Sequence, residues 1–134
     1  MNEGELKILK VLKDFEEFIE DHSQYLEELE NMIAIAEPDY NRAVRIVRRI
    51  RRVRKNILEG TSIILQNISE VKDPNIKEES IGIVSYLQLI GLKDEKDLLR
   101  SLNELVKKSG YDLDIQSDIE QLDGAIASLS KLSF

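Results

Sequence analysis

Hydrophobic residues recur along the first third of the chain with the spacing of an α-helix that packs on one side. Asn2 and Glu5 have the spacing of a helix-capping box, which marks a helix start. The positions that follow alternate in steps of four and three residues: Ile8, Leu12, Phe15, Ile19, His22, Leu26, Leu29 and Ile33. This alternation is the heptad pattern of a coiled-coil seam. We therefore predict a helix over residues 2–36.

A second long helix with the same kind of pattern is predicted over residues 39–72. Pro38 cannot continue the first helix, and Asp39 is a good N-cap for the next one. At about 1.5 Å per residue each helix would be roughly 50 Å long. The short connection favours antiparallel packing, which predicts a long helical hairpin. Gly60 lies inside the second helix, where we expect a kink or a close approach of the first helix.

The remaining residues, 73–134, are predicted to form three shorter helices. The first begins at Asp73 and ends at Gly91, and the second ends at Gly110. Ser117, with an acidic residue three positions later, has the pattern of a capping box for the third. These helices would cover part of the apolar face of the hairpin and complete a helical bundle.

The whole chain, residues 1–134, is therefore predicted to be a single all-α domain. Its composition agrees, with 34% charged and 5% aromatic residues and two prolines. Two long helices alone expose much of their seam, so we expect a homo-oligomer or a subunit of a larger complex. The high charge also suits a thermophilic source, in which ion-pair networks gain value with temperature.

The sequence has no motif that indicates enzymatic activity, a cofactor or a metal. Cysteine is absent, and we find no glycine-rich phosphate loop, nucleophile elbow or zinc motif. Residues 112–123 partly match an EF-hand calcium loop, but Ser117 stands where the loop needs glycine and Asp123 where it needs glutamate. His22, the single histidine, falls on the seam and is expected to be a core residue. No signal peptide or membrane-spanning stretch is evident, so we expect a cytoplasmic protein without a membrane partner.

One stretch stands out against the formal net charge of −7. Residues 42–55 read RAVRIVRRIRRVRK, in which eight of fourteen side chains are cationic and none is anionic. The cations are Arg42, Arg45, Arg48, Arg49, Arg51, Arg52, Arg54 and Lys55. The seam would take Ala43, Ile46, Ile50 and Val53, which leaves the cations on the remaining circumference of the helix. Seven of the eight are arginine, whose planar fork suits bidentate contact with phosphate or carboxylate.

We interpret this stretch as a binding surface for a nucleic-acid backbone, DNA or RNA, without sequence preference. No aromatic residue interrupts it, so stacking on bases is not expected. Three alternatives remain open. The cations could meet an acidic protein surface in a coiled-coil or virion assembly, or they could pair internally with Glu27, Glu28 and Glu30 of the first helix. Alternatively, the acidic residues of that helix could mimic nucleic acid in an inhibitor protein; they are Glu16, Glu17, Glu20 and Asp21.

Small all-helical subunits with one basic face also occur in CRISPR effector complexes and among the coiled-coil proteins of archaeal viruses. That likeness concerns only size and helix content. The diagnostic residues of a known family are not found in this chain.

Overall fold

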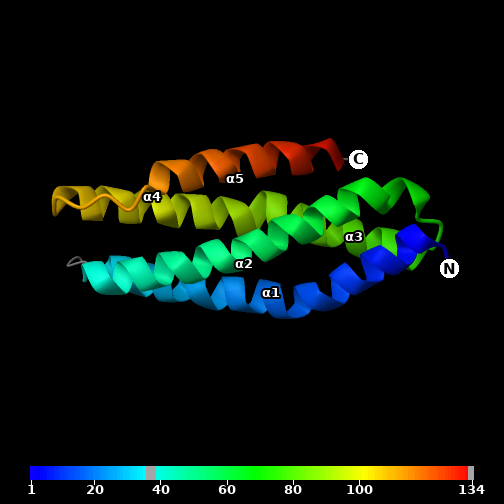
Figure 1. Ribbon diagram of the computed structural model, residues 1–134, viewed down its shortest axis with the longest axis horizontal. Coiled ribbons are helices and arrows are strands. Elements are labelled where there is room, and N and C mark those ends of the chain that lie inside the picture. The colour runs from blue at the N-terminus through cyan, green and yellow to red at the C-terminus, as the bar shows by residue number, and fades with distance from the viewer. Residues whose placement is uncertain (36–38, 133–134) are drawn as a thin grey trace.

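A computed structural model describes residues 1–35 and 39–132, and within these residues it contains helices and no strand. The helices lie roughly along one common direction and form an elongated bundle (Figure 1). The described residues form five α-helices: α1 (Glu3–Ala34), α2 (Tyr40–Asn67), α3 (Pro74–Tyr86), α4 (Leu92–Lys108) and α5 (Ile115–Leu129). The predicted all-helical fold is confirmed. None of the described helices is both long enough and apolar enough to cross a membrane.

The predicted starts of α1 and α2 are confirmed by their caps. Asn2 Oδ1 accepts a hydrogen bond from the backbone N–H of Glu5 at 2.8 Å, and Glu5 Oε1 accepts one from the N–H of Asn2 at 3.1 Å. Asp39 Oδ1 accepts from the N–H groups of Asn41 and Arg42. These bonds satisfy backbone donors that the first turn of a helix leaves unpaired.

The ends of the two long helices differ from the expectation. α2 ends at Asn67, five residues before the predicted end at residue 72, and a 3₁₀ turn over Ile68–Glu70 follows it. α1 ends at Ala34, and the predicted end at residue 36 lies outside the described residues, as does Pro38.

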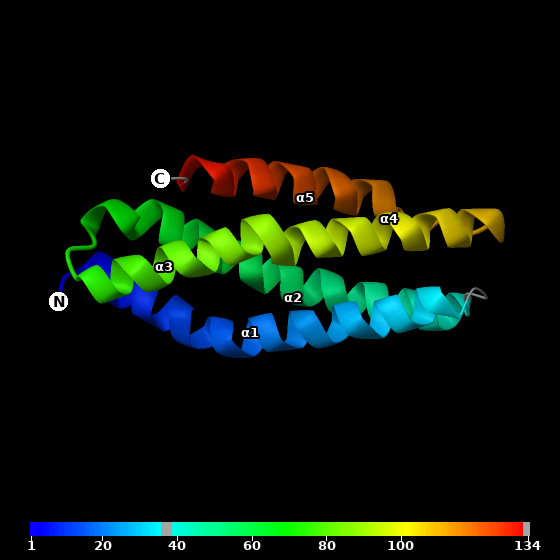
Figure 2. The same cartoon turned by 180° about the vertical axis from the view of Figure 1, so that it is seen from behind.

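α1 and α2 pack side by side along much of their length (Figures 1 and 2). Gly60 of α2 lies against the ring of Phe15 of α1, and Arg49 of α2 lies near Glu28 of α1. A higher residue number in α2 thus pairs with a lower one in α1, so the two helices run in opposite directions. The close approach that Gly60 predicted is confirmed, because a Cβ atom there would lie 2.3 Å from Phe15 Cε1.

The predicted helix end at Gly91 is wrong. α3 and α4 are joined without a break by a π-helical segment, Leu87–Gly91, in which the N–H of Leu92 donates to the carbonyl of Leu87 (Figure 2). Leu87 and Leu92 are both fully buried although they are five residues apart. A π turn has hydrogen bonds between residues five apart, so it allows the apolar faces of α3 and α4 to point toward the same core. Gly91 has a right-handed helical backbone here, and the chain therefore has one long helix where we predicted two shorter ones.

The capping box predicted at Ser117 is also wrong. α5 begins two residues earlier at Ile115, after Asp114, whose φ of 57° is left-handed. The Ser117 hydroxyl lies inside the first turn and donates to Asp114 Oδ1 at 2.9 Å. By contrast, Gly110 follows the end of α4 with a φ of 83°, a conformation that glycine adopts easily, as predicted.

The helices after residue 73 bury the apolar seam of α1 and α2. Ile8, Leu29, Ile50 and Ile57 of the seam have no exposed surface, and they belong to the same core cluster as Leu99 of α4. The exposed seam that led us to expect a second copy is thus covered by the chain itself.

A carboxylate ties the start of α1 to the segment before α3. Glu5 Oε2 accepts hydrogen bonds from the backbone N–H groups of Asp73 at 2.9 Å and Lys72 at 3.2 Å. These donors, Asp73 first and Asn2 next, lower the pKa of Glu5 below its ordinary value, because they favour the ionised form. The N-terminus is thereby held at the end of the bundle where α2 turns into α3.

Candidate nucleic-acid interface

The cationic stretch lies within α2, and six of its eight cations line the side of the helix that faces solvent. They recur three or four residues apart, which places them on one face. Arg42 is half-buried and the others are exposed. Ala43, Ile46, Ile50 and Val53 are buried on the opposite side, as predicted. We call the six residues the basic ridge: Arg42, Arg45, Arg48, Arg49, Arg52 and Lys55.

Within residues 1–35 and 39–132, one residue of the basic ridge has an internal partner. Arg49 Nη1 lies 3.6 Å from Glu28 Oε2, and both side chains remain well exposed, at 49% and 39%. Among the described residues, no carboxylate oxygen lies within 4.0 Å of the other five ridge cations. Glu27 and Glu30, which the alternative of internal pairing would have placed against the cations, therefore do not pair with them. An exposed pair of this kind contributes about 0 to 1 kcal/mol, so Arg49 remains available to a ligand.

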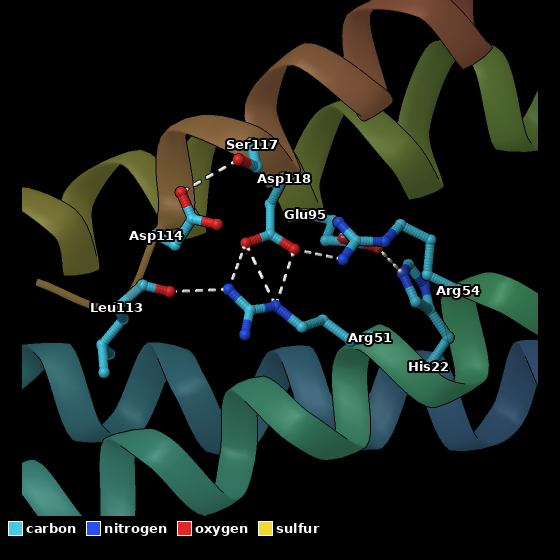
Figure 3. Close-up of polar contacts among 8 residues, drawn as sticks. All are labelled: His22, Arg51, Arg54, Glu95, Leu113, Asp114, Ser117 and Asp118. Carbon is cyan, nitrogen blue, oxygen red and sulfur yellow. Dashed lines mark hydrogen bonds and ion pairs between the residues drawn. The ribbon is translucent and has the colours of Figure 1, made fainter.

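Arg51 differs from the ridge because it is held by α5 (Figure 3). Its Nε donates to Asp118 Oδ1 at 3.0 Å, and its Nη2 donates to Asp118 Oδ2 at 2.6 Å and to the carbonyl of Leu113 at 2.7 Å. The hydrogen bonds to Asp118 raise the pKa of Arg51 above its ordinary value. The prediction that Arg51 is free for a ligand is wrong, because a phosphate would have to displace this carboxylate.

Arg54 is not on the surface, so its predicted place among the exposed cations is wrong. Its side chain is 3% exposed. One guanidinium nitrogen, Nη2, contacts Asp118 Oδ1, and the other, Nη1, lies 3.1 Å from Glu95 Oε2. Glu95 also contacts His22, whose Nε2 lies 2.7 Å from Glu95 Oε1 (Figure 3). His22 is a core residue as predicted, but its neighbour is a carboxylate.

Together His22, Arg54, Glu95 and Asp118 form what we call the buried charge cluster, with one residue each from α1, α2, α4 and α5. The spacing of apolar residues in α2 already indicated that one member of the cluster, Arg54, points toward the core. Arg54 comes four residues after Ile50 and three before Ile57, both fully buried, so helical spacing places it toward the core. Charged groups in such a position must be paired, and the cluster supplies the partners.

The buried charge cluster does not form a metal site. Within residues 1–35 and 39–132, no group of three or more His, Asp or Glu side chains is arranged to hold a metal ion. Asp118, an acid of the EF-hand-like stretch, is occupied by Arg51 and Arg54. The arrangement fixes α5 against α2 and leaves the basic ridge as the part of the cationic stretch that remains accessible.

Comparison of the chain with protein-family models, with curated proteins and with solved structures finds no match. Its function must therefore be inferred from its own residues and geometry. The feature from which a function is best inferred is the basic ridge, because exposed charges of this kind generally contribute little to stability.

Proposed function

We propose that this protein is a non-enzymatic helical protein that binds the phosphate backbone of nucleic acid through the basic ridge, inside the cell and as part of a larger assembly. The observation that carries this proposal is a row of six cations on one face of α2, five of them exposed, with one carboxylate within 4.0 Å among the described residues. A helix surface that serves solubility alone usually alternates the sign of its charges.

The spacing of the ridge supports contact with a row of phosphates. From Arg42 to Lys55 the helix rises about 20 Å, with a cation at every turn. Arginine forks bind phosphate oxygens in pairs. Tyr40, at the start of α2, is stacked on Tyr111 with ring centroids 4.2 Å apart, so this ring is engaged within the protein. Binding would therefore read charge and shape, without a preference for sequence.

The proposal includes the finer description of the support beneath the ridge. We take α1 and α2 to be a long antiparallel hairpin with coiled-coil packing along the heptad seam. Such a support would hold the ridge straight and rigid, so that the cations are arranged before a ligand arrives and little ordering entropy is lost on binding.

Salt dependence of binding gives the first test. Fluorescence anisotropy with duplex DNA, duplex RNA and a single strand should show affinity that falls as salt rises. If about four ridge residues reach phosphates, the log-log slope should be near −3.6 on duplex DNA and near −2.8 on a single strand. An affinity that does not change with salt would contradict a phosphate contact.

Charge reversal of the ridge gives the second part of the test. The variant Arg45→Glu, Arg48→Glu, Arg49→Glu and Arg52→Glu should lose binding and keep its helical circular dichroism spectrum, because all four side chains are exposed. The matched control reverses four exposed lysines outside the ridge: Lys10→Glu, Lys13→Glu, Lys77→Glu and Lys93→Glu. Both variants have the same net charge. Equal loss of binding in the two would show that net charge, and not the ridge, attracts the ligand.

The acidic face of α1 supports a second candidate function. Glu16, Glu17 and Glu20 are exposed, and among the described residues no cation lies within 4.0 Å of them. A face of this kind can occupy the basic channel of a nucleic-acid enzyme as a mimic. Capture of a basic enzyme that survives nuclease treatment, with no binding of nucleic acid by the protein itself, would favour this function over the first.

A further inference from the structure

A groove lies between α1 and the continuous α3–α4 helix, on the side of the bundle away from α2 (Figures 1 and 2). α2 is nearest the viewer in Figure 1, whereas α1 and the continuous α3–α4 helix border each other in the view from behind (Figure 2). Between them is a groove of about 420 Å³. Leu26, Tyr86 and Leu98 give it an apolar lining. Its acidic residues are Glu27, Glu30, Asp94 and Asp97, and we call it the acidic groove.

The four carboxylates of the acidic groove have no cationic partner in the described part of the chain, where no Lys or Arg nitrogen lies within 4.0 Å of them. They form two pairs, each three residues apart, on two neighbouring helices. The π-helical segment that contributes Gly91 to the groove also carries two exposed apolar side chains, Leu89 at 65% and Ile90 at 50%. The groove itself combines these unpaired carboxylates with an apolar lining, and an apolar centre with a polar rim is typical of a protein interface.

We propose that the acidic groove binds the basic ridge of a second copy of this chain. The two surfaces are complementary in charge and in period, because cations one helical turn apart would meet carboxylates one helical turn apart. Arginine is the side chain that such a groove suits. Its guanidinium can bind carboxylates and stack on the ring of Tyr86, while its aliphatic stem packs on the apolar lining of Leu26 and Leu98.

The position of the two surfaces determines the form of the assembly. The ridge belongs to α2 and the groove to α1 and the α3–α4 helix, so a pair of copies held by one ridge–groove contact still has one free ridge and one free groove. The contact is heterologous, and further copies add in the same direction to give an open, head-to-tail series. This inference does not require the proposed function, but the two share the ridge, so a nucleic acid bound there would exclude a neighbouring copy.

Sedimentation velocity on the nuclease-treated protein gives a first test. At about 0.01 M salt the Debye length is about 30 Å, and the average mass should rise with protein concentration. At about 1 M salt, where the Debye length is about 3 Å, the protein should be a monomer. A monomer at low salt and high protein concentration would overturn the proposal.

Two neutral variants give a sharper test, because a head-to-tail contact allows them to complement each other. The groove variant carries Glu27→Gln, Glu30→Gln, Asp94→Asn and Asp97→Asn. The ridge variant carries Arg45→Gln, Arg48→Gln, Arg49→Gln and Arg52→Gln. Each variant alone should be monomeric at low salt and keep the circular dichroism spectrum of the wild type.

Mixed together, the two variants should form a 1:1 complex and nothing larger, since the intact ridge of one fits the intact groove of the other. Failure of the mixture to associate, or association of the groove variant alone, would overturn the proposal. The groove variant should still bind nucleic acid if the proposed function is right. The two proposals therefore fail independently of each other.

Discussion

Arg52 and Arg54 are two residues apart on the same helix, yet they have opposite environments. Arg52 belongs to the exposed basic ridge, whereas Arg54 is 2% exposed and pairs with Glu95 and Asp118. Removing one partner of a buried ion pair leaves an uncompensated charge in the interior. We predict that Arg54→Met lowers the free energy of unfolding by about 3 to 5 kcal/mol. Arg52→Met should change it by less than about 0.5 kcal/mol.

Urea unfolding of both variants, followed by circular dichroism, measures this difference. A shift in the midpoint for Arg54→Met that is no larger than for Arg52→Met would contradict the buried pairing. Arg54→Met should also leave nucleic-acid binding unchanged under conditions in which it remains folded, because its side chain does not reach the surface.

At the residue level, the sequence predicted part of the candidate site. It identified all six residues of the basic ridge, because an amphipathic repeat separates apolar from polar positions on one helix. It did not identify the roles of Arg51 and Arg54, since their partners Asp118 and Glu95 lie on α5 and α4, far along the chain. Helical periodicity indicates the direction in which a side chain points, but it does not identify the charged partner that another helix places next to it.

At the level of elements, the contact between α1 and α2 depends on the absence of a side chain at Gly60. A Cβ atom there would meet the fully buried ring of Phe15. We predict that Gly60→Ala destabilises the protein by about 1 to 3 kcal/mol through overpacking, although alanine favours a helix. At Gly82, where nothing lies within 4 Å of an added Cβ, alanine should instead stabilise α3 by up to about 1 kcal/mol. Melting temperatures of the two variants should therefore move in opposite directions.

A second substitution tests whether the Phe15 ring is the cause. Adding Phe15→Leu to Gly60→Ala removes the ring atoms that the new methyl group meets. The double variant should therefore lose less free energy of unfolding than the sum of the losses in the two single variants. Additive losses would show that Gly60 is needed for another reason.

Three helix starts were predicted correctly from their caps. The caps at Asn2, Asp39 and Asp73 act through hydrogen bonds between residues close in the chain, so a local pattern identifies them. Gly91 resembled a helix end for the same local reason. The π turn that carries the helix through it depends on Leu87 and Leu92 both reaching the core, which is a property of the packed molecule.

At the scale of the whole molecule, the buried charge cluster connects helices from both halves of the chain. It joins His22 of α1, Arg54 of α2, Glu95 of α4 and Asp118 of α5. If one of these helices separated from the bundle, a buried charged side chain on the remaining helices would lose its partner of opposite charge. The core residues of all five helices also belong to one cluster. Both features favour unfolding as a single unit.

We therefore predict that residues 1–134 unfold in one cooperative transition, as one domain. In calorimetry the measured enthalpy should equal the van't Hoff enthalpy, and circular dichroism should coincide with tyrosine fluorescence. Tyr40 and Tyr111 stack at one end of the bundle, so with the other two tyrosines removed by Tyr25→Phe and Tyr86→Phe the fluorescence reports on the contact between α2 and the segment after α4. In that background, loss of the tyrosine signal before the helical signal would mean that this end opens separately. Because Arg54 joins α2 to α5 through the buried carboxylate of Asp118, Arg54→Met is the variant in which a separate opening of this end should first become visible.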